Sequence, residues 1–295
     1  MNRTYRQWAR VVAVGGLFLG VSMLANAQSP QSGQSGQQPA QQPTQQPADK
    51  DKKPEVKDLT LDGAAKPAPV NAEEEAAYKA FLAETDPAKK VALGEAFIQK
   101  YPESRYRPPL YSSMTSLYLQ TNQIEKMEEI GDKEVALNPS DVQVMAILAQ
   151  TLPRALNAKT PSPEKELAKA EGYAKRAIEM TPTIPKPEGI TDDVFAKAKN
   201  QTLAMAHSGL GLVYVRRGKF ADAIPELDQA VKVDPTPDPV NFYLLGLSNK
   251  NTSHFDDAIV AFNKCAAIPG AMANPCKNGA EEAKKLSSTQ LSAPK

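Results

Sequence analysis

Histidine and cysteine are the side chains best suited to bind a metal or act as a nucleophile, and the sequence has two of each. Neither His207 nor His254 has a cysteine or carboxylate at the spacing of a metal site. We interpret His207 as a helix packing residue and His254 as a solvated residue in a turn. Acidic runs such as Glu73–Glu75 and Glu128–Glu129 are typical of solvated helix faces.

The common catalytic and phosphate-binding motifs are absent from the sequence. It contains no G-x-S-x-G, no phosphate loop and no H-E-x-x-H. The sequence therefore predicts no catalytic residues, no metal ligands and no cofactor. An enzyme with an unrecognised site is a remaining hypothesis, which a cleft of convergent residues with shifted pKa values would favour.

Cys265 and Cys276 lie near the end of one expected helix and at the start of the next. We predict that they form a disulfide, because an exported chain folds in an oxidising compartment. A loop of about 12 residues would contribute roughly 3 kcal/mol in the chain-entropy model. The alternative is a buried small residue at Cys265 and a free thiol at Cys276.

Export is indicated by residues 1–27, which have the layout of a signal peptide. Arginines precede the apolar run Val11–Leu24, and Ala25-Asn26-Ala27 matches the small-x-small pattern of a cleavage site. The apolar run is shorter than the about 20 residues that a membrane-spanning helix needs. We predict cleavage after Ala27, a periplasmic or secreted location and no integral membrane span in the mature chain. The alternative is an uncleaved anchor.

The next segment, residues 28–70, has too little apolar surface to form a core. Residues 28–48 contain only Gln, Pro, Ser, Gly, Ala and Thr, and a mixed-charge, proline-broken stretch follows. We predict a disordered Gln/Pro-rich linker. The chain carries +1, and residues 1–27 hold three arginines and no acid, so the remainder carries −2. This balance gives no electrostatic reason to bind nucleic acid.

Residues 203–237 indicate two antiparallel helices joined by a turn at Arg217–Gly218–Lys219. Small residues, Gly211 and Ala223, stand where the two helices must touch. The same pattern returns 35 residues later, and a period near 34 is typical of a helix-turn-helix repeat. The packing positions are Leu210, Gly211, Tyr214, Ala223, Leu227 and Pro235, then Leu245, Gly246, Ala258 and Phe262.

We therefore predict an all-α fold over residues 71–286, an α-solenoid of antiparallel helix pairs. The pairs are expected near 71–102, 108–141, 142–182, 192–237 and 239–272, followed by a closing helix at 274–286 and a flexible tail at 287–295. Residues 153–163 are an insertion within the third pair. The first helix of the fourth pair is about three turns too long, and we expect its extension to pack against the preceding pair. In the second pair Met127, Gly131 and Glu134 replace a small, an aromatic and a small residue.

These residues resemble the tetratricopeptide repeat (TPR). One unit has His207-x-x-Leu210-Gly211-x-x-Tyr214, Ala223-x-x-x-Leu227 and Pro235, and the next has Phe242-x-x-Leu245-Gly246 and Ala258-x-x-x-Phe262. The chain departs from the family pattern at His207, Leu227 and Asn249, and Pro269 comes one residue early. The resemblance implies a right-handed superhelix whose first helices line a concave groove that binds peptides or proteins without chemistry of its own.

By this likeness the groove would carry one face of the first helices. Its residues would be Met205, Ser208, Leu212, Val215, Val240, Tyr243, Leu247 and Lys250, with Ser112, Ser116, Leu119, Ala146 and Gln150 from earlier units. The alternative is that the long helix or the linker covers this face. The Lys/Asn pattern that holds a C-terminal carboxylate in chaperone-binding members is absent.

Two functional hypotheses follow. The first is an exported, non-catalytic scaffold that binds a protein or peptide partner of unknown identity in the groove. The alternative is a structural or assembly factor of the bacterial cell envelope. It rests on Phe97-x-x-x-Tyr101-Pro102-x-Ser104, which resembles a helix end in envelope repeat proteins.

Overall fold

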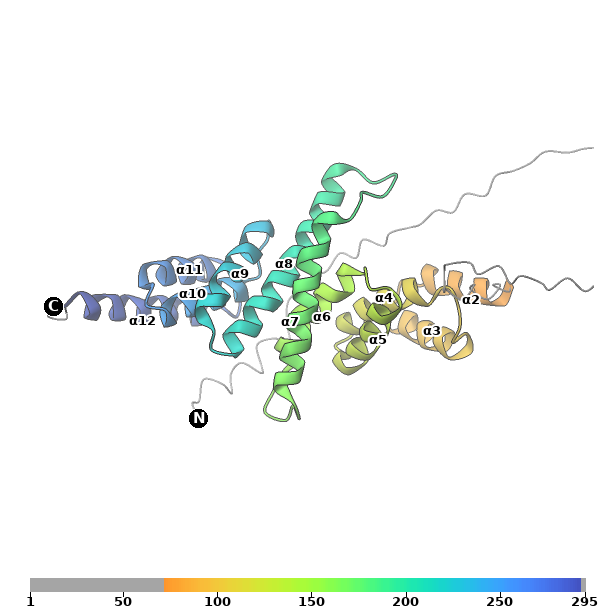
Figure 1. Cartoon of the computed structure of the whole chain (residues 1–295), viewed down its shortest axis with the longest axis horizontal. Coiled ribbons are helices and arrows are strands. Elements are labelled where there is room, and N and C mark those ends of the chain that lie inside the picture. The colour runs from red at the N-terminus through yellow and green to blue at the C-terminus, as the bar shows by residue number, and fades with distance from the viewer. Residues whose placement is uncertain (1–71, 293–295) are drawn as a thin grey trace, which may run out of the picture. The chain divides into compact units, whose positions relative to one another are not determined.

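The structure, a computed structural model, describes residues 72–292, and these contain helices and no strand. The elements are α2 (Ala72–Ala83), α3 (Pro87–Lys100), α4 (Arg107–Gln120), α5 (Ile124–Leu137), α6 (Val142–Ala155), α7 (Pro163–Met180), η1 (Thr181–Thr183), α8 (Asp192–Arg216), α9 (Phe220–Val233), α10 (Pro239–Asn251), α11 (Phe255–Ala267) and α12 (Ala273–Ser292) (Figure 1). The predicted signal peptide and linker lie outside the described residues.

Neighbouring helices pack as five consecutive pairs: α2 with α3, α4 with α5, α6 with α7, α8 with α9 and α10 with α11. The first helices also contact one another across pairs, α4 with α6, α6 with α8 and α8 with α10. The predicted all-α fold of stacked helix pairs is confirmed. Among residues 72–292, no helix combines the length and apolar character that a membrane crossing requires.

Three of the pairs use the same turn between their helices. Asn122, Gly218 and Ser253 have φ of 56°, 72° and 63°, the left-handed region. In each case the amide of the following residue donates a hydrogen bond to the carbonyl five residues before it. Lys219 N, for example, lies 2.9 Å from Tyr214 O. This is the Schellman helix end, which favours glycine because a Cβ is costly at positive φ. Only one of the three positions is a glycine.

Small residues bring the two helices of a pair together, as the sequence predicts. A Cβ added at Gly211 would lie 2.6 Å from Leu227 Cγ, and one at Gly246 would lie 2.7 Å from Phe262 Cδ1. The partner alanines, Ala223 and Ala258, are fully buried. The TPR-type contact between paired helices is therefore present in both units.

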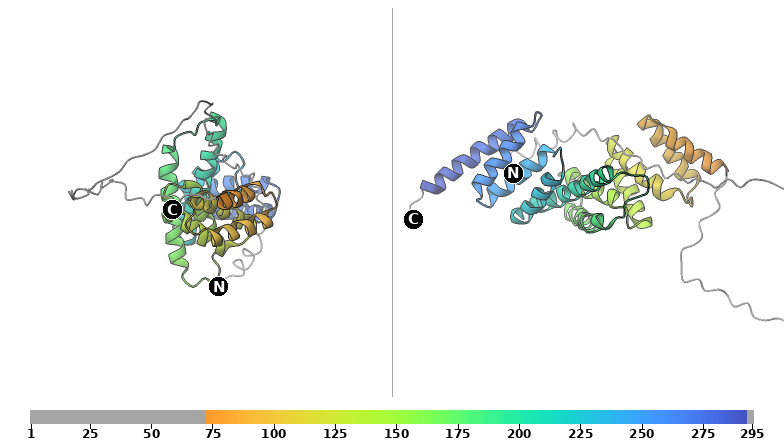
Figure 2. Two further views of the ribbon diagram at one scale, coloured as in Figure 1. Left: turned by 90° about the vertical axis from the view of Figure 1, so that its right-hand side faces the viewer. Right: turned by 90° about the horizontal axis from the view of Figure 1, so that it is seen from above.

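The closing helix is longer than predicted. It runs from Ala273 to Ser292, so the tail predicted from residue 287 is helical as far as Ser292. No glycine or proline lies between Ala280 and Ser292 to end it, and Pro294 is the next helix breaker. The helix lies beside α11 (Figure 2). Its buried residues Ala280 and Ala283 cluster with Phe262 of α11.

The long helix α8 packs as expected on the preceding pair. It contacts α6, α7 and η1, and Lys199 Nζ donates a hydrogen bond to the Pro182 carbonyl at 2.8 Å. Of the predicted insertion, only residues 156–162 connect the two helices, and Pro163 lies in the first turn of α7. Pro153 lies within α6.

The backbones of two pairs meet at Gly209, a residue for which the sequence alone predicts no contact. A Cβ added there would lie 2.4 Å from the Ala149 carbonyl oxygen and 2.5 Å from its carbon. The backbones of α6 and α8 therefore touch at this point. Backbone atoms cannot move aside as a flexible side chain can, so glycine is required.

We predict that Gly209→Ala lowers the free energy of unfolding by about 3 kcal/mol or more, because the added methyl overlaps the α6 backbone. Gly172→Ala is the matched control. Gly172 lies within α7 and nothing stands within 4 Å of its missing Cβ. That variant should gain about 0.5–1 kcal/mol from helix propensity. Urea unfolding followed by circular dichroism measures both, and equal effects would contradict the close contact.

Candidate functional site

The first helices carry the face that the sequence predicts as a binding surface. We call it the first-helix face and define it by Met205, Ser208, Leu212 and Val215 on α8 and Val240, Tyr243, Leu247 and Lys250 on α10. Ser208 and Leu212 are buried, with 1% and 5% of their surface exposed. The other six are half-buried. Ser208 and Leu212 thus pack against neighbouring pairs, and a partner could contact the half-buried positions.

A polar bridge crosses this face and joins three consecutive pairs. Arg154, in the last turn of α6, places Nη1 3.0 Å from Asp238 Oδ2 at the start of α10. Its Nη2 donates to Ser208 Oγ on α8 at 3.2 Å. Ser208 Oγ donates in turn to Asn241 Oδ1 at 2.6 Å. We call these four residues the Arg154 bridge.

The bridge is partly shielded from water and electrically balanced. The side chains of Arg154 and Asp238 are 21% and 33% exposed, and Asn241 is buried. Asp238 Oδ1 also accepts from Val240 N at 2.9 Å, so this carboxylate caps α10 while it pairs with the guanidinium. Charge-assisted hydrogen bonds of this kind hold helices in register.

One donor of the bridge has no partner. Arg154 Nε is buried and has no hydrogen-bond acceptor. An unpaired buried donor costs about 1–3 kcal/mol, so the remaining contacts must offset it. Of the four, only Ser208 is predicted from the sequence as a site residue. The Asp238-Pro239 pair is a helix-start signal, but no local pattern connects it to Arg154, 84 residues earlier.

The apolar part of the face is organised around Tyr243. Its ring centroid lies 5.6 Å from that of Phe262 in an edge arrangement. Tyr243 packs on two clusters, one containing Leu212 and Leu244 and the other containing Ala280 of α12. Burial, and secondarily the negative charge of Glu282, raises the pKa of its hydroxyl.

The far end of the face contacts the closing helix. Leu247 packs on the cluster that includes Ala280 and Ala283, and Lys250 Nζ lies 2.9 Å from Glu282 Oε2. Both partners belong to α12. The closing helix therefore covers part of the surface that the sequence predicts as a groove. Val215, Val240 and Tyr243 form the rest of the apolar face, and all three pack on the cluster that contains Leu212 and Leu244.

The two histidines have the structural roles expected of them. His207 Nδ1 lies 2.7 Å from Glu226 Oε2, which connects α8 to α9. His254 is exposed in the α10–α11 turn, with Nδ1 3.1 Å from Thr252 Oγ1. Within the described part of the chain, no three His, Cys, Asp or Glu side chains gather as a metal site.

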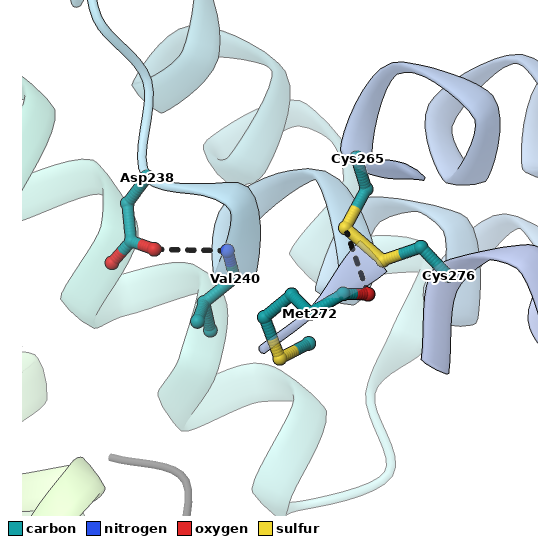
Figure 3. Close-up of a disulfide and its surroundings, with 5 residues drawn as sticks. All are labelled: Asp238, Val240, Cys265, Met272 and Cys276. Atoms are coloured by element: carbon teal, nitrogen blue, oxygen red, sulfur yellow. Dashed lines mark hydrogen bonds between the residues drawn. A yellow bond between two sulfur atoms is a disulfide. The ribbon is translucent and has the colours of Figure 1, made fainter. Parts of the chain in front are cut away.

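Cys265 and Cys276 are joined, as predicted. Their sulfurs are 1.93 Å apart and their Cα atoms 5.8 Å apart (Figure 3). Both residues are fully buried, one in α11 and the other in α12. The Met272 carbonyl oxygen lies 4.0 Å from Cys265 Sγ. The disulfide thus fastens the closing helix to the fifth pair.

The structure is therefore an all-α array of helix pairs with TPR-type packing between the paired helices. No protein-family model and no curated protein matches the chain. Among solved structures, it is similar to the MamA RS-1 ArsTM double mutant, with 15% identity, 76% of this chain and 99% of that chain covered, and a TM-score of 0.48.

Two further solved structures are similar. TTC0263, a thermophilic TPR protein in Thermus thermophilus, has 18% identity, 74% of this chain and 99% of that chain covered, and a TM-score of 0.42. PilW, described as a widely conserved type IV pilus biogenesis factor, has 14% identity and a TM-score of 0.47, and the match covers 76% of this chain and 96% of that chain. These likenesses concern the fold.

We predict that reduction of the disulfide lowers the free energy of unfolding by about 3 kcal/mol, because the loop of the unfolded chain is no longer closed. The double variant Cys265→Ala/Cys276→Ala should not respond to reductant. Mass spectrometry after alkylation supplies the direct check. Untreated protein should take up no alkyl group, and uptake of two would rule out the bond.

Proposed function

We propose that this protein is an exported, non-catalytic scaffold that binds a protein or peptide partner along its first-helix face. The observation that carries the proposal is the set of half-buried apolar side chains, Val215, Val240 and Tyr243, that remains there after the pairs have packed. Contiguous apolar surface that stays exposed after folding is typical of an interaction site, and these three side chains pack on one cluster.

The chemistry of the face suits an uncharged or apolar segment of a partner. Arg154, which donates to Ser208 of the face, is already paired with Asp238. Lys250 is paired with Glu282. A partner would therefore gain mainly from burying apolar surface against Tyr243 and its neighbours, as in helix or peptide recognition by a helical groove.

Export is supported by two independent observations. The sequence of residues 1–27 has the pattern of a signal peptide. The buried Cys265–Cys276 disulfide is typical of chains that fold in an oxidising compartment.

The alternative, an envelope structural or assembly factor, loses part of its motivation. Phe97 and Ser104 are both buried. The Phe97 and Tyr101 rings lie 5.1 Å apart, and Ser104 Oγ accepts from Tyr106 N at 3.0 Å. Packing and a turn explain these residues without an envelope partner.

Affinity capture from envelope extracts tests the proposal. We expect Val215→Lys and Tyr243→Lys each to reduce the amount of captured partner at least tenfold, because each introduces a charge into the apolar part of the face. Val260→Lys is the matched control, since Val260 is 53% exposed on the second helix α11. Thermal unfolding checks that all three variants fold.

Retention of the partner by folded Val215→Lys and Tyr243→Lys would contradict the assigned surface. Loss by Val260→Lys alone would move the site to the second helices. Co-sedimentation of the unaltered chain with cell-wall material, with no soluble partner, would favour the envelope alternative.

A further inference from the structure

One buried carboxylate stands outside the first-helix face. Glu134 lies near the end of α5 at a position where the TPR pattern has a small residue, and only 1% of its surface is exposed. Both of its carboxylate oxygens are buried and no donor lies in regular hydrogen-bond geometry to either, while the side chains of Asn138 and Asp141 are its polar neighbours. An ionised carboxylate in such a place is strongly disfavoured.

Its position is the corner between the second and third helix pairs. Glu134 precedes the end of α5 at Leu137, and α6 begins after Asp141, whose Oδ1 accepts from Val144 N at 3.0 Å. The same two helices touch one turn earlier, where a Cβ on Gly131 would lie 3.0 Å from Leu148 Cδ2. Any expansion around Glu134 therefore acts on the α5–α6 contact.

We propose that Glu134 and Asp141 form a pH-sensitive joint between the second and third helix pairs, which is closed while Glu134 is protonated and loosens when Glu134 ionises.

Glu134 forms no ion pair among the described residues, and the groups that act on its pKa are Asp141 and Asn138 rather than a cation. On α5 itself, Lys133 pairs with Glu129, and Asp132 binds Lys169 and Tyr173 of α7. Charged and polar groups on neighbouring helices also have partners of their own: Arg107 of α4 pairs with Glu103, the Tyr118 hydroxyl of α4 donates to Glu95, and Arg176 of α7 donates to the Pro139 carbonyl. Asp141, at the start of α6, brings a second negative charge.

Burial, and secondarily the charge of Asp141, raises the pKa of Glu134 to about 7, while the Asn138 amide acts weakly in the opposite direction. Because the folded-state pKa lies above the ordinary value of 4.5, the stabilisation is fully present below about pH 4.5 and is lost as the pH rises through about 7. From pH 5.5 to pH 8.5 this group alone should raise the unfolding equilibrium constant about thirtyfold.

Urea unfolding of the purified chain across this pH range tests the joint. We expect Glu134→Gln to remove the thirtyfold change, while Glu129→Gln, an exposed neighbour on the same helix, keeps it. If Glu134→Gln fails to fold, Glu134→Met serves in its place. Glu166 on α7 also has a raised pKa, from burial and from Glu128, so each result is a difference between variants.

Asp141→Asn distinguishes the joint from a merely structural role. Asparagine caps a helix as well as aspartate does, so α6 should form normally. Loss of the Asp141 charge should shift the pH midpoint of the transition downward. Hydrogen exchange should show amide protection at residues 131–145 falling above neutral pH, with α11 and α12 unchanged.

The proposal is overturned if the unaltered chain and the folded Glu134 variant show the same pH dependence. It is also overturned if protection falls equally in all helices, or if Asp141→Asn leaves the midpoint in place.

Discussion

The close contact of α6 and α8 at Gly209 and Ala149 is the constraint on which the other features depend. It sets the distance between the third and fourth pairs to that of two backbones in contact. Ser208 precedes Gly209, so the same contact brings its hydroxyl within reach of Arg154. The Arg154 bridge and the apolar face beside it exist because the first helices approach this closely.

The contact also explains why the predicted groove is partly closed. Side chains on first helices that approach closely face the next helix rather than solvent, which buries Ser208 and Leu212. At the end of the array, α12 packs on the last pair and takes up Leu247 and Lys250. The half-buried side chains of Val215, Val240 and Tyr243 keep part of their surface exposed.

Much of the fold could be predicted because it is encoded locally. The period near 34, the small residues Gly211 and Ala223 and the helix-start proline Pro163 all act within one pair. Gly209 and Gly211 look alike in the sequence, but one faces the neighbouring pair and the other faces its own partner helix. The insertion after α6 changes the spacing between pairs, so no fixed offset reveals which residue Gly209 meets.

The candidate site was harder to predict for the same reason. Arg154 and Asp238 are 84 residues apart. They belong to the third and fifth helix pairs, and the fourth pair lies between them in the sequence. Glu134 was recognisable as a departure from the repeat pattern, but its burial depends on how α5 meets α6. The sequence shows that a residue is unusual, and the packing between pairs decides what it does.

The Arg154–Asp238 contact offers the most direct test of the claim that three consecutive pairs stack through their first helices. A double-mutant cycle would combine Arg154→Met, which keeps most of the apolar stem, with Asp238→Asn, which keeps the cap. We expect the free energies of unfolding to show a coupling of about 1–2 kcal/mol. Additivity within about 0.3 kcal/mol would contradict the stacked arrangement.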